Sequence, residues 1–298
     1  MDIRNVQKTG NMFYVYLPTR WVKQFNISSG SKVSTHQKND GSLAISPNIQ
    51  EKELLQLDLN LLKEDMSNIN KLIVACYVNP LKSFSINLEK ELDISKLLLQ
   101  KKLLSLEMVE FDGKHISCES SFSIDDPFSL LKTMIKKIKN LIYVMKNNYN
   151  KELIDRYEEE IDRSKLHVSK SVISMLTHNK PSKHKIIELH YMDMIARDLE
   201  RLVDHLKETP SSDKSFLNVI EKIIICLENL IISADLKSDE LLSYSKIMEF
   251  TKESNKIPFL GVKDSITYHK VRVKAALEAI SETLMNWSIT EEISKKTI

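Results

Sequence analysis

Carboxylates spaced four residues apart are the most chemically suggestive pattern in this sequence. Glu200 and Asp204 lie in LERLVDHL, and Glu158 and Asp162 lie in YEEEIDR. Residues four apart in a helix share one face, about one turn from each other. If the two helices are antiparallel neighbours, four carboxylates meet in one oxygen-rich pocket. Such a pocket requires a cation or a basic partner, because unneutralised carboxylates repel one another.

These acids predict a metal site of hard oxygen ligands, with His205 as a further candidate ligand. The set suits magnesium, manganese, iron or zinc and does not choose among them. A solvated salt-bridge face is the competing interpretation, because Arg163, Arg197 and Arg201 are available to pair with the same acids. Exposed ion pairs of that kind contribute little to stability.

The histidines do not form a catalytic pattern. They are scattered along predicted helices without a spacing that pairs a nucleophile with a base. These are His167, His178, His184, His190 and His205. The sequence also has no glycine-rich phosphate-binding loop. We therefore expect a protein that is not an enzyme and has no catalytic residues.

Positive charge is concentrated in the first fifty residues. This segment has six bases against two acids, a net charge of +4. The rest of the chain has 37 bases against 39 acids, a net charge of −2. Such asymmetry is expected if only the N-terminal segment meets a polyanion.

Residues 1–50 also predict a small β-rich module. NMFYVYLP alternates as a strand does, and TRWVKQF is typical of a short helix. KVSTHQ and LAISP then flank a turn at Asp40 and Gly41, where glycine takes the positive φ that the turn needs. A unit of about fifty residues is close to the limit for independent folding, so we expect it to dimerise.

This module resembles the swapped-hairpin barrel of the SpoVT-AbrB and MazE type. A basic first strand followed by a glycine, and the stretch YLPTRWVKQFNISSG, carry the resemblance. It implies a homodimer whose protomers interleave hairpins and bind double-stranded DNA. It also implies that phosphates, and base edges in the case of the arginines, are contacted by Arg4, Lys8, Arg20 and Lys23. Members of this family bind protein partners as well.

Residues 51–124 predict a small α/β connector. MSNINKLIVACYVNPL and residues 93–106 are typical of helices, and KSFSINLE is typical of a strand. A hairpin is expected around Asp112 and Gly113. No function follows from this segment.

Residues 125–298 predict long helices in two similar triplets. Apolar residues recur at three- and four-residue steps from about residue 126, which is typical of amphipathic bundle helices. The repeats cover about 125–210 and 213–290, and LEAISETL at 277–284 aligns with LERLVDHL at 199–206. We expect a pair of three-helix bundles. The second copy departs from the acidic pattern, because it has Ala279 and Glu282 where the first has arginine and aspartate.

The helical region resembles the PhoU family, whose members consist of two three-helix repeats with acidic helix motifs. ARDLERLVDHL and YEEEIDR carry this resemblance. It implies a divalent or iron-type metal at the acidic motifs and a link to the control of phosphate transport. It also implies a transporter ATPase or a signalling protein as a partner. Together, the two resemblances match archaeal phosphate uptake regulators.

The chain as a whole predicts a mainly α fold with a small β module. No apolar run is long enough to span a bilayer, and the N-terminus has no apolar export signal, so we expect a cytoplasmic protein without membrane insertion. The leading hypothesis is a homodimeric, DNA-binding transcription regulator linked to phosphate uptake. The alternative is an adaptor that does not bind DNA and docks on a phosphate transporter or a signalling partner.

Overall fold

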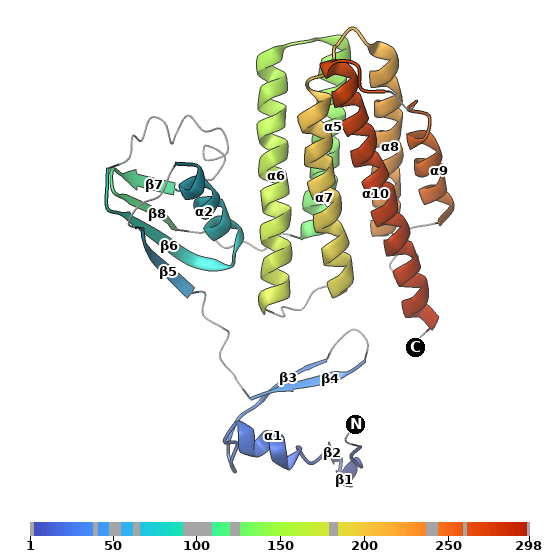
Figure 1. Ribbon diagram of the computed structural model, residues 1–298. Coiled ribbons are helices and arrows are strands. Elements are labelled where there is room, and N and C mark those ends of the chain that lie inside the picture. Colours follow the sequence, from blue (N-terminus) through green and yellow to red (C-terminus); the bar gives the residue numbers. More distant parts are fainter. Residues whose placement is uncertain are drawn as a thin grey trace. The chain divides into compact units, whose positions relative to one another are not determined.

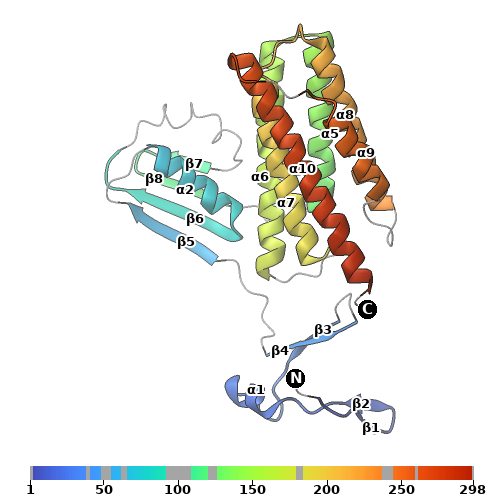
Figure 2. The same cartoon turned by 45° about the vertical axis from the view of Figure 1, so that its right-hand side comes forward.

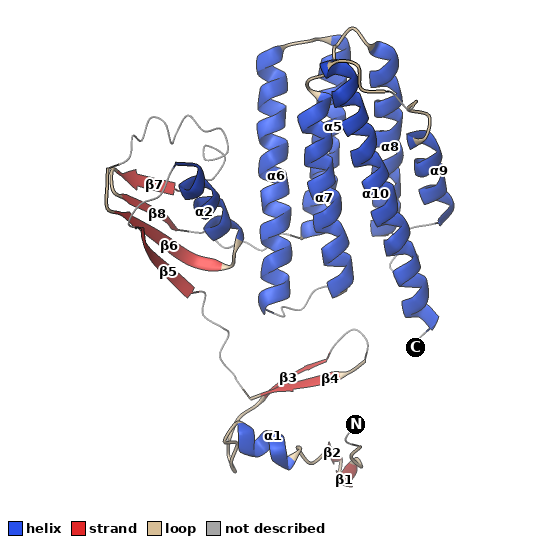
Figure 3. Ribbon diagram, in the orientation of Figure 1, coloured by secondary structure: helices blue, strands red, loops and turns tan. Residues whose placement is uncertain are grey.

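The chain divides into two compact units, Met1–Glu53 and Leu54–Ile298. The expected connector and the expected helical region both fall in the second unit, and helices dominate its described part (Figure 3). The helix expected at 93–106 lies outside the described residues. The computed structural model describes residues 3–37, 41–47, 55–61, 66–91, 109–119, 126–178, 184–236, 244–258 and 261–296.

Two hairpins and one short helix make up the described part of the first unit. Each hairpin is antiparallel, with β1 paired to β2 and β3 paired to β4. The order of elements is the one expected from the sequence, and α1 begins directly after Pro18. The bounds are β1 (Gln7–Thr9), β2 (Met12–Tyr14), α1 (Thr19–Gln24), β3 (Ser34–Gln37) and β4 (Leu43–Ser46).

This first unit has no core of its own among its described residues. None of the described side chains is buried. Met12, Phe13 and Leu43 are 73%, 69% and 63% exposed. Burying each such side chain contributes about 1.5–3 kcal/mol, and isolated two-stranded hairpins are marginally stable. The described residues of one chain form no closed barrel, so the interleaved barrel stays a prediction.

A four-stranded sheet with one helix over it opens the second unit. The strand order is β5-β6-β8-β7, with β5 parallel to β6 and the other pairs antiparallel. The strand expected at KSFSINLE is confirmed as β6, and the expected hairpin is confirmed with Gly113 at φ 62°. The bounds are β5 (Leu55–Leu61), α2 (Met66–Val78), β6 (Leu81–Leu88), β7 (Val109–Asp112) and β8 (His115–Glu119).

The remaining described residues form a six-helix bundle whose helices lie side by side (Figures 1 and 2). The two expected triplets, α5–α7 and α8–α10, pack on each other, since α5 contacts α8 and α7 contacts α10. Buried residues from all six helices belong to one core. The expected pair of bundles is therefore a single bundle. Its bounds are α5 (Pro127–Asn147), α6 (Lys151–His178), α7 (Ile186–Leu206), α8 (Lys214–Leu236), α9 (Tyr244–Ser254) and α10 (Ser265–Lys296).

Helix α6 contributes to the core of the sheet as well as to that of the bundle. Alternate residues of the strands, including Phe84, Ile86 and Ile116, are buried beneath α2. Leu166 of α6 belongs to this second core. The phenol of Tyr77 on α2 lies 3.2 Å from Nε2 of His167. The sheet module and the bundle are thus joined through one face of α6.

Aspartates fix the start of two bundle helices. Asp126 precedes Pro127 and caps α5, where it accepts hydrogen bonds from the backbone N–H and the hydroxyl of Ser129. Asp213 accepts from the backbone N–H of Phe216 at 3.1 Å at the start of α8. It also forms an ion pair with Lys270 of α10, which ties the start of one helix to the side of another.

Replacing Asp213 by alanine should lower the free energy of unfolding by about 1–2 kcal/mol, because a cap is lost. The hydrogen bond from Lys270 is the main cause that holds the pKa of Asp213 below its ordinary value. A depressed folded-state pKa means that the stabilisation is present above the ordinary carboxyl pKa and is lost as the pH falls through the lowered value. Urea unfolding of the wild type and of Asp213→Asn should therefore converge in acid. A constant difference at every pH would contradict this, and Ser212→Ala is the control.

Candidate functional site

Complete burial of one apolar stripe fixes the rotation of α7. Leu199, Leu202 and Leu206 have no exposed surface. Glu200 and Asp204 lie beside this stripe and are half-buried. Their carboxylates are therefore held at the side of the helix that meets α6.

Three of the four expected carboxylates come together between α6 and α7. One carboxylate oxygen each from Asp162, Glu200 and Asp204 lie within 4.8 Å of one another. The two helices that carry them are neighbours in Figures 1 and 2. Within the described ranges, no other group of three acidic, histidine or cysteine side chains has this geometry. We call these three residues the acidic cluster.

The fourth carboxylate, Glu158, has a basic partner instead. It is 9% exposed and forms an ion pair with Lys207, which follows the end of α7. Burial acts to lower the pKa of the Lys207 ammonium, but the hydrogen bond and charge of Glu158, together with the charges of Asp204 and Glu208, raise that pKa above its ordinary value. The role of Glu158 as a metal ligand stays a prediction. Sequence reasoning missed Lys207, although a base just beyond a helix end is a recognisable signal.

The arginines of α7 have acidic partners on their own helix. Arg197 pairs with Asp193 at 2.8 Å, and Arg201 pairs with Asp198 at 3.1 Å. Burial raises the pKa of Asp198, and Arg201 opposes that effect. The competing interpretation paired these arginines with the cluster acids. The ion pairs of Arg197 and Arg201 instead involve Asp193 and Asp198.

His205 turns away from the cluster toward α10. Its Nδ1 lies 3.1 Å from Nδ1 of His269, and Arg272 donates to its Nε2 at 3.4 Å. Burial lowers the pKa of His205, and the neighbouring His269 and Arg272 lower it further. The structure therefore does not group this imidazole with the three carboxylates. His269 and Arg272 were not anticipated from the sequence.

The donor set of the cluster fits a hard cation. Three half-buried carboxylates supply only oxygen ligands, which magnesium, manganese and iron accept. Asp162, Glu200 and Asp204 would hold the ion, and its charge would offset the repulsion among them. Because the ligands come from two helices, a bound cation would also crosslink α6 to α7.

The second triplet does not repeat this arrangement in the described residues. Glu278, the counterpart of Glu200, lies 3.7 Å from Lys274 on the same helix. Glu282, the counterpart of Asp204, is exposed. The second copy therefore differs from the first in the placement of its acids as well as in sequence.

The basic residues expected to contact DNA all lie on the surface of the first unit. Arg4, Lys8, Arg20 and Lys23 are exposed. The ammonium of Lys8 lies 5.4 Å from the centre of the Phe13 ring. Contact with DNA stays a prediction for each of these four residues.

Fold and cluster together define a helical-bundle protein with a carboxylate site between two antiparallel helices. Residues 127–209 match the PhoU domain family. The match spans α5, α6 and α7, the triplet that carries the acidic cluster. No curated protein and no solved structure matches the chain. None of the described helices is both long and apolar enough to cross a membrane.

Manganese should stabilise the wild type and should not stabilise Asp204→Asn. At a free metal concentration about 100 times the Kd, binding adds roughly 2.7 kcal/mol to the free energy of unfolding. Thermal and urea unfolding, with and without the metal, would measure this. Glu208→Gln removes an exposed acid four residues further on and is the matched control. Equal responses of the two variants would mean that the metal only screens surface charge.

Proposed function

We propose that this protein is a homodimeric, DNA-binding transcription regulator of phosphate uptake, in which the helical region receives the signal. The PhoU domain at residues 127–209 supports a regulatory role in phosphate uptake rather than an enzymatic one. The observation that carries the DNA-binding part is a basic first unit in which no described side chain is buried. These two features lie in separate units, as expected for a reader of DNA joined to a sensor.

The exposed apolar side chains of the first unit support a second copy of this chain as its partner. Tyr16 and Val15, on the segment between β2 and α1, are 61% and 48% exposed, and Ile45 on β4 is 38% exposed. Two identical hairpin modules that interleave would bury these side chains symmetrically, as homodimer interfaces do. Dimerisation through this unit would then be a condition for its folding.

The basic side chains of this unit support DNA as the ligand of such a dimer. Arg20 and Lys23 lie three residues apart on α1, so they share one face of that helix. Arg4 precedes β1 and Lys8 lies within it. In a dimer these positions are doubled, which gives a cationic surface for the phosphates of a duplex.

The acidic cluster supports the helical region as the sensor. A cation held by Asp162, Glu200 and Asp204 would crosslink α6 to α7 and so fix the packing of these two helices. The effector would then be a divalent or iron-type ion, alone or together with a partner. A transporter ATPase or a signalling protein is the partner that we propose for the bundle.

Charged residues in place of the exposed apolar side chains should separate the dimer. Phe13→Asp combined with Val15→Asp is expected to give a sedimentation mass near the 34.5 kDa of one chain, and the wild type twice that mass. Tyr149→Asp removes a 56% exposed aromatic side chain from the bundle and should leave the dimer intact. A double variant that stays dimeric would refute the proposed interface.

DNA affinity should fall steeply with salt. Four phosphate contacts per protomer give a slope of roughly −7 in log K against log salt for a dimer, at about −0.9 per contact. Arg20→Ala should reduce the slope by about 1.8, because one contact is lost from each protomer. Binding to the upstream DNA of the protein's own gene, measured from low to moderate salt, tests this.

A control and a clear negative outcome accompany the salt titration. Lys274→Ala, on α10 of the bundle, removes a base outside the proposed surface and should leave the slope unchanged. A flat titration, or full binding by a variant that lacks all four bases, would refute the proposed DNA-binding surface. The absence of any binding at low salt would leave the adaptor alternative. In that case the first unit would serve only to dimerise the protein.

A further inference from the structure

The face of the four-stranded sheet opposite α2 has an unusual composition. Phe84, Ile86, Ile116 and Cys118 alternate along β6 and β8 and are buried beneath α2. The residues between them therefore point to the opposite face. That face carries a hollow of about 570 Å³, within the range of about 300–1,000 Å³ that is common for ligand pockets.

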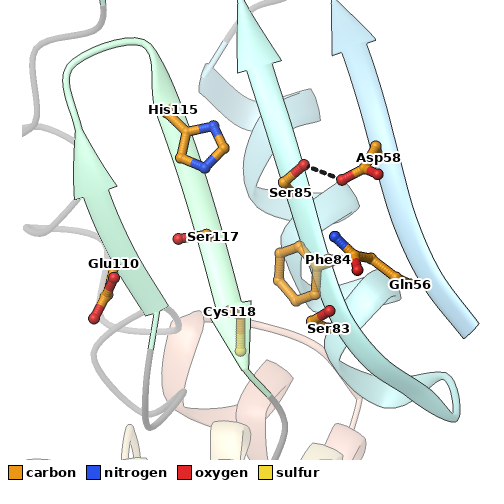
Figure 4. Close-up of a pocket in the computed structure, with 9 residues that line it drawn as sticks. All are labelled: Gln56, Asp58, Ser83, Phe84, Ser85, Glu110, His115, Ser117 and Cys118. Atoms are coloured by element: carbon orange, nitrogen blue, oxygen red, sulfur yellow. Dashed lines mark hydrogen bonds between the residues drawn. The ribbon is translucent and has the colours of Figure 1, made fainter. Parts of the chain in front are cut away.

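Polar side chains form straight rows across the strands of this face, and the lining of the hollow includes one complete row together with His115, Gln56 and Ser83. The strand register aligns Asp58, Ser85, Ser117 and Glu110 in one row that crosses all four strands. A second row lies two residues further along each strand and consists of Asn60, Asn87, His115 and Asp112. Figure 4 shows His115, Ser117 and Ser85 on the two middle strands, with Asp58 and Glu110 on the outer ones.

Hydrogen bonds within these rows occupy one donor each of Ser85, Asn87 and His115. Ser85 donates its hydroxyl hydrogen to Asp58 at 2.5 Å (Figure 4). Asn87 donates to the side-chain oxygen of Asn60 at 3.0 Å. His115 Nδ1 lies 2.7 Å from the side-chain oxygen of Asn87, so Nδ1 carries the hydrogen and Nε2 is an acceptor. The carboxylates of Asp58 and Glu110 remain acceptors that face the hollow.

The charge of this face is negative. Asp58, Glu110 and Asp112 are exposed acids, and none of the described lysines and arginines lines the hollow. An anion, and a nucleic acid above all, would be repelled. A ligand for this face must therefore bring positive charge and hydrogen-bond donors.

The two acids of the first row lie at opposite ends of it. Neighbouring strands are about 4.8 Å apart, so three intervals place the Cα atoms of Asp58 and Glu110 about 14 Å apart. The serine hydroxyls of β6 and β8 form the floor between them. A linear molecule with an ammonium group at each end matches this spacing, because each end meets a carboxylate while its middle lies over hydroxyl groups.

We propose that this sheet face binds a linear aliphatic polyamine, with one terminal ammonium on Asp58, the other on Glu110, and the chain across Ser85 and Ser117. Charge-assisted hydrogen bonds between ammonium and carboxylate hold the two ends. A monoamine can use only one of the two acids. Selectivity for the longer polycation follows from the distance between them.

Calorimetric titration of the full-length protein with spermidine, spermine and n-butylamine at equal ionic strength tests this assignment. Spermidine and spermine should bind at least about tenfold more tightly than butylamine, because they reach both carboxylates. Asp58→Asn keeps the acceptor for Ser85 and should weaken spermidine binding by about tenfold, as should Glu110→Gln. The two changes together should abolish it. Amide signals of β5, β6 and β8 should shift on titration.

Two matched controls exclude binding elsewhere. Glu249→Gln removes an exposed acid from α9 and should have no effect. Asp204→Asn disrupts the acidic cluster and should also leave spermidine affinity unchanged. Loss of binding in Asp204→Asn but not in Asp58→Asn would overturn the assignment, as would equal affinity for spermidine and butylamine. Binding of a lysine-rich peptide without binding of spermidine would overturn it too.

Discussion

The burial of the apolar stripe of α7 is the constraint on which the acidic cluster depends. Leu199, Leu202 and Leu206 are enclosed by the common core, so α7 cannot rotate without opening a cavity. Glu200 and Asp204 are therefore presented to α6 whether or not a cation is bound. The packing of α7 therefore sets where these two carboxylates lie. A cation that enters such a site finds its ligands already in place, which reduces the ordering entropy that binding would otherwise cost.

The first unit differs from the bundle in how its functional side chains are held. It has the strands and turns of a small domain but no buried side chain in its described part. In the proposed function, a partner molecule supplies the surfaces that stabilise it. If that molecule is a second copy, dimerisation and the presentation of Arg4, Lys8, Arg20 and Lys23 become a single event. Conditions that separate the protomers would then also remove the DNA-binding surface.

Much of the fold could be predicted because apolar periodicity and capping residues are local signals. The stripe of α5 and its start at Asp126 are examples. The end of the second repeat was placed too early: it is expected at about 290, but α10 continues to Lys296. Ile289 and Ile293 there are exposed, so no buried stripe marks the last turns, and no glycine or proline stops them. The pairing of Glu158 with Lys207 could not be predicted, because it depends on how α6 and α7 pack against each other. The polar rows of the sheet depend on a strand order that no local pattern encodes.

Helix α6 is the element that the bundle and the sheet have in common. Asp162 belongs to the acidic cluster, and Leu166, one turn further along, lies in the core beneath α2. A helix is stiff over so short a distance, so a rotation or slide that starts at the carboxylate reaches the leucine almost undiminished. The core between α2 and the sheet would not absorb this movement, because close-packed interiors resist even small displacements. An ion that holds Asp162 to α7 would therefore also restrain the position of Leu166 beneath α2.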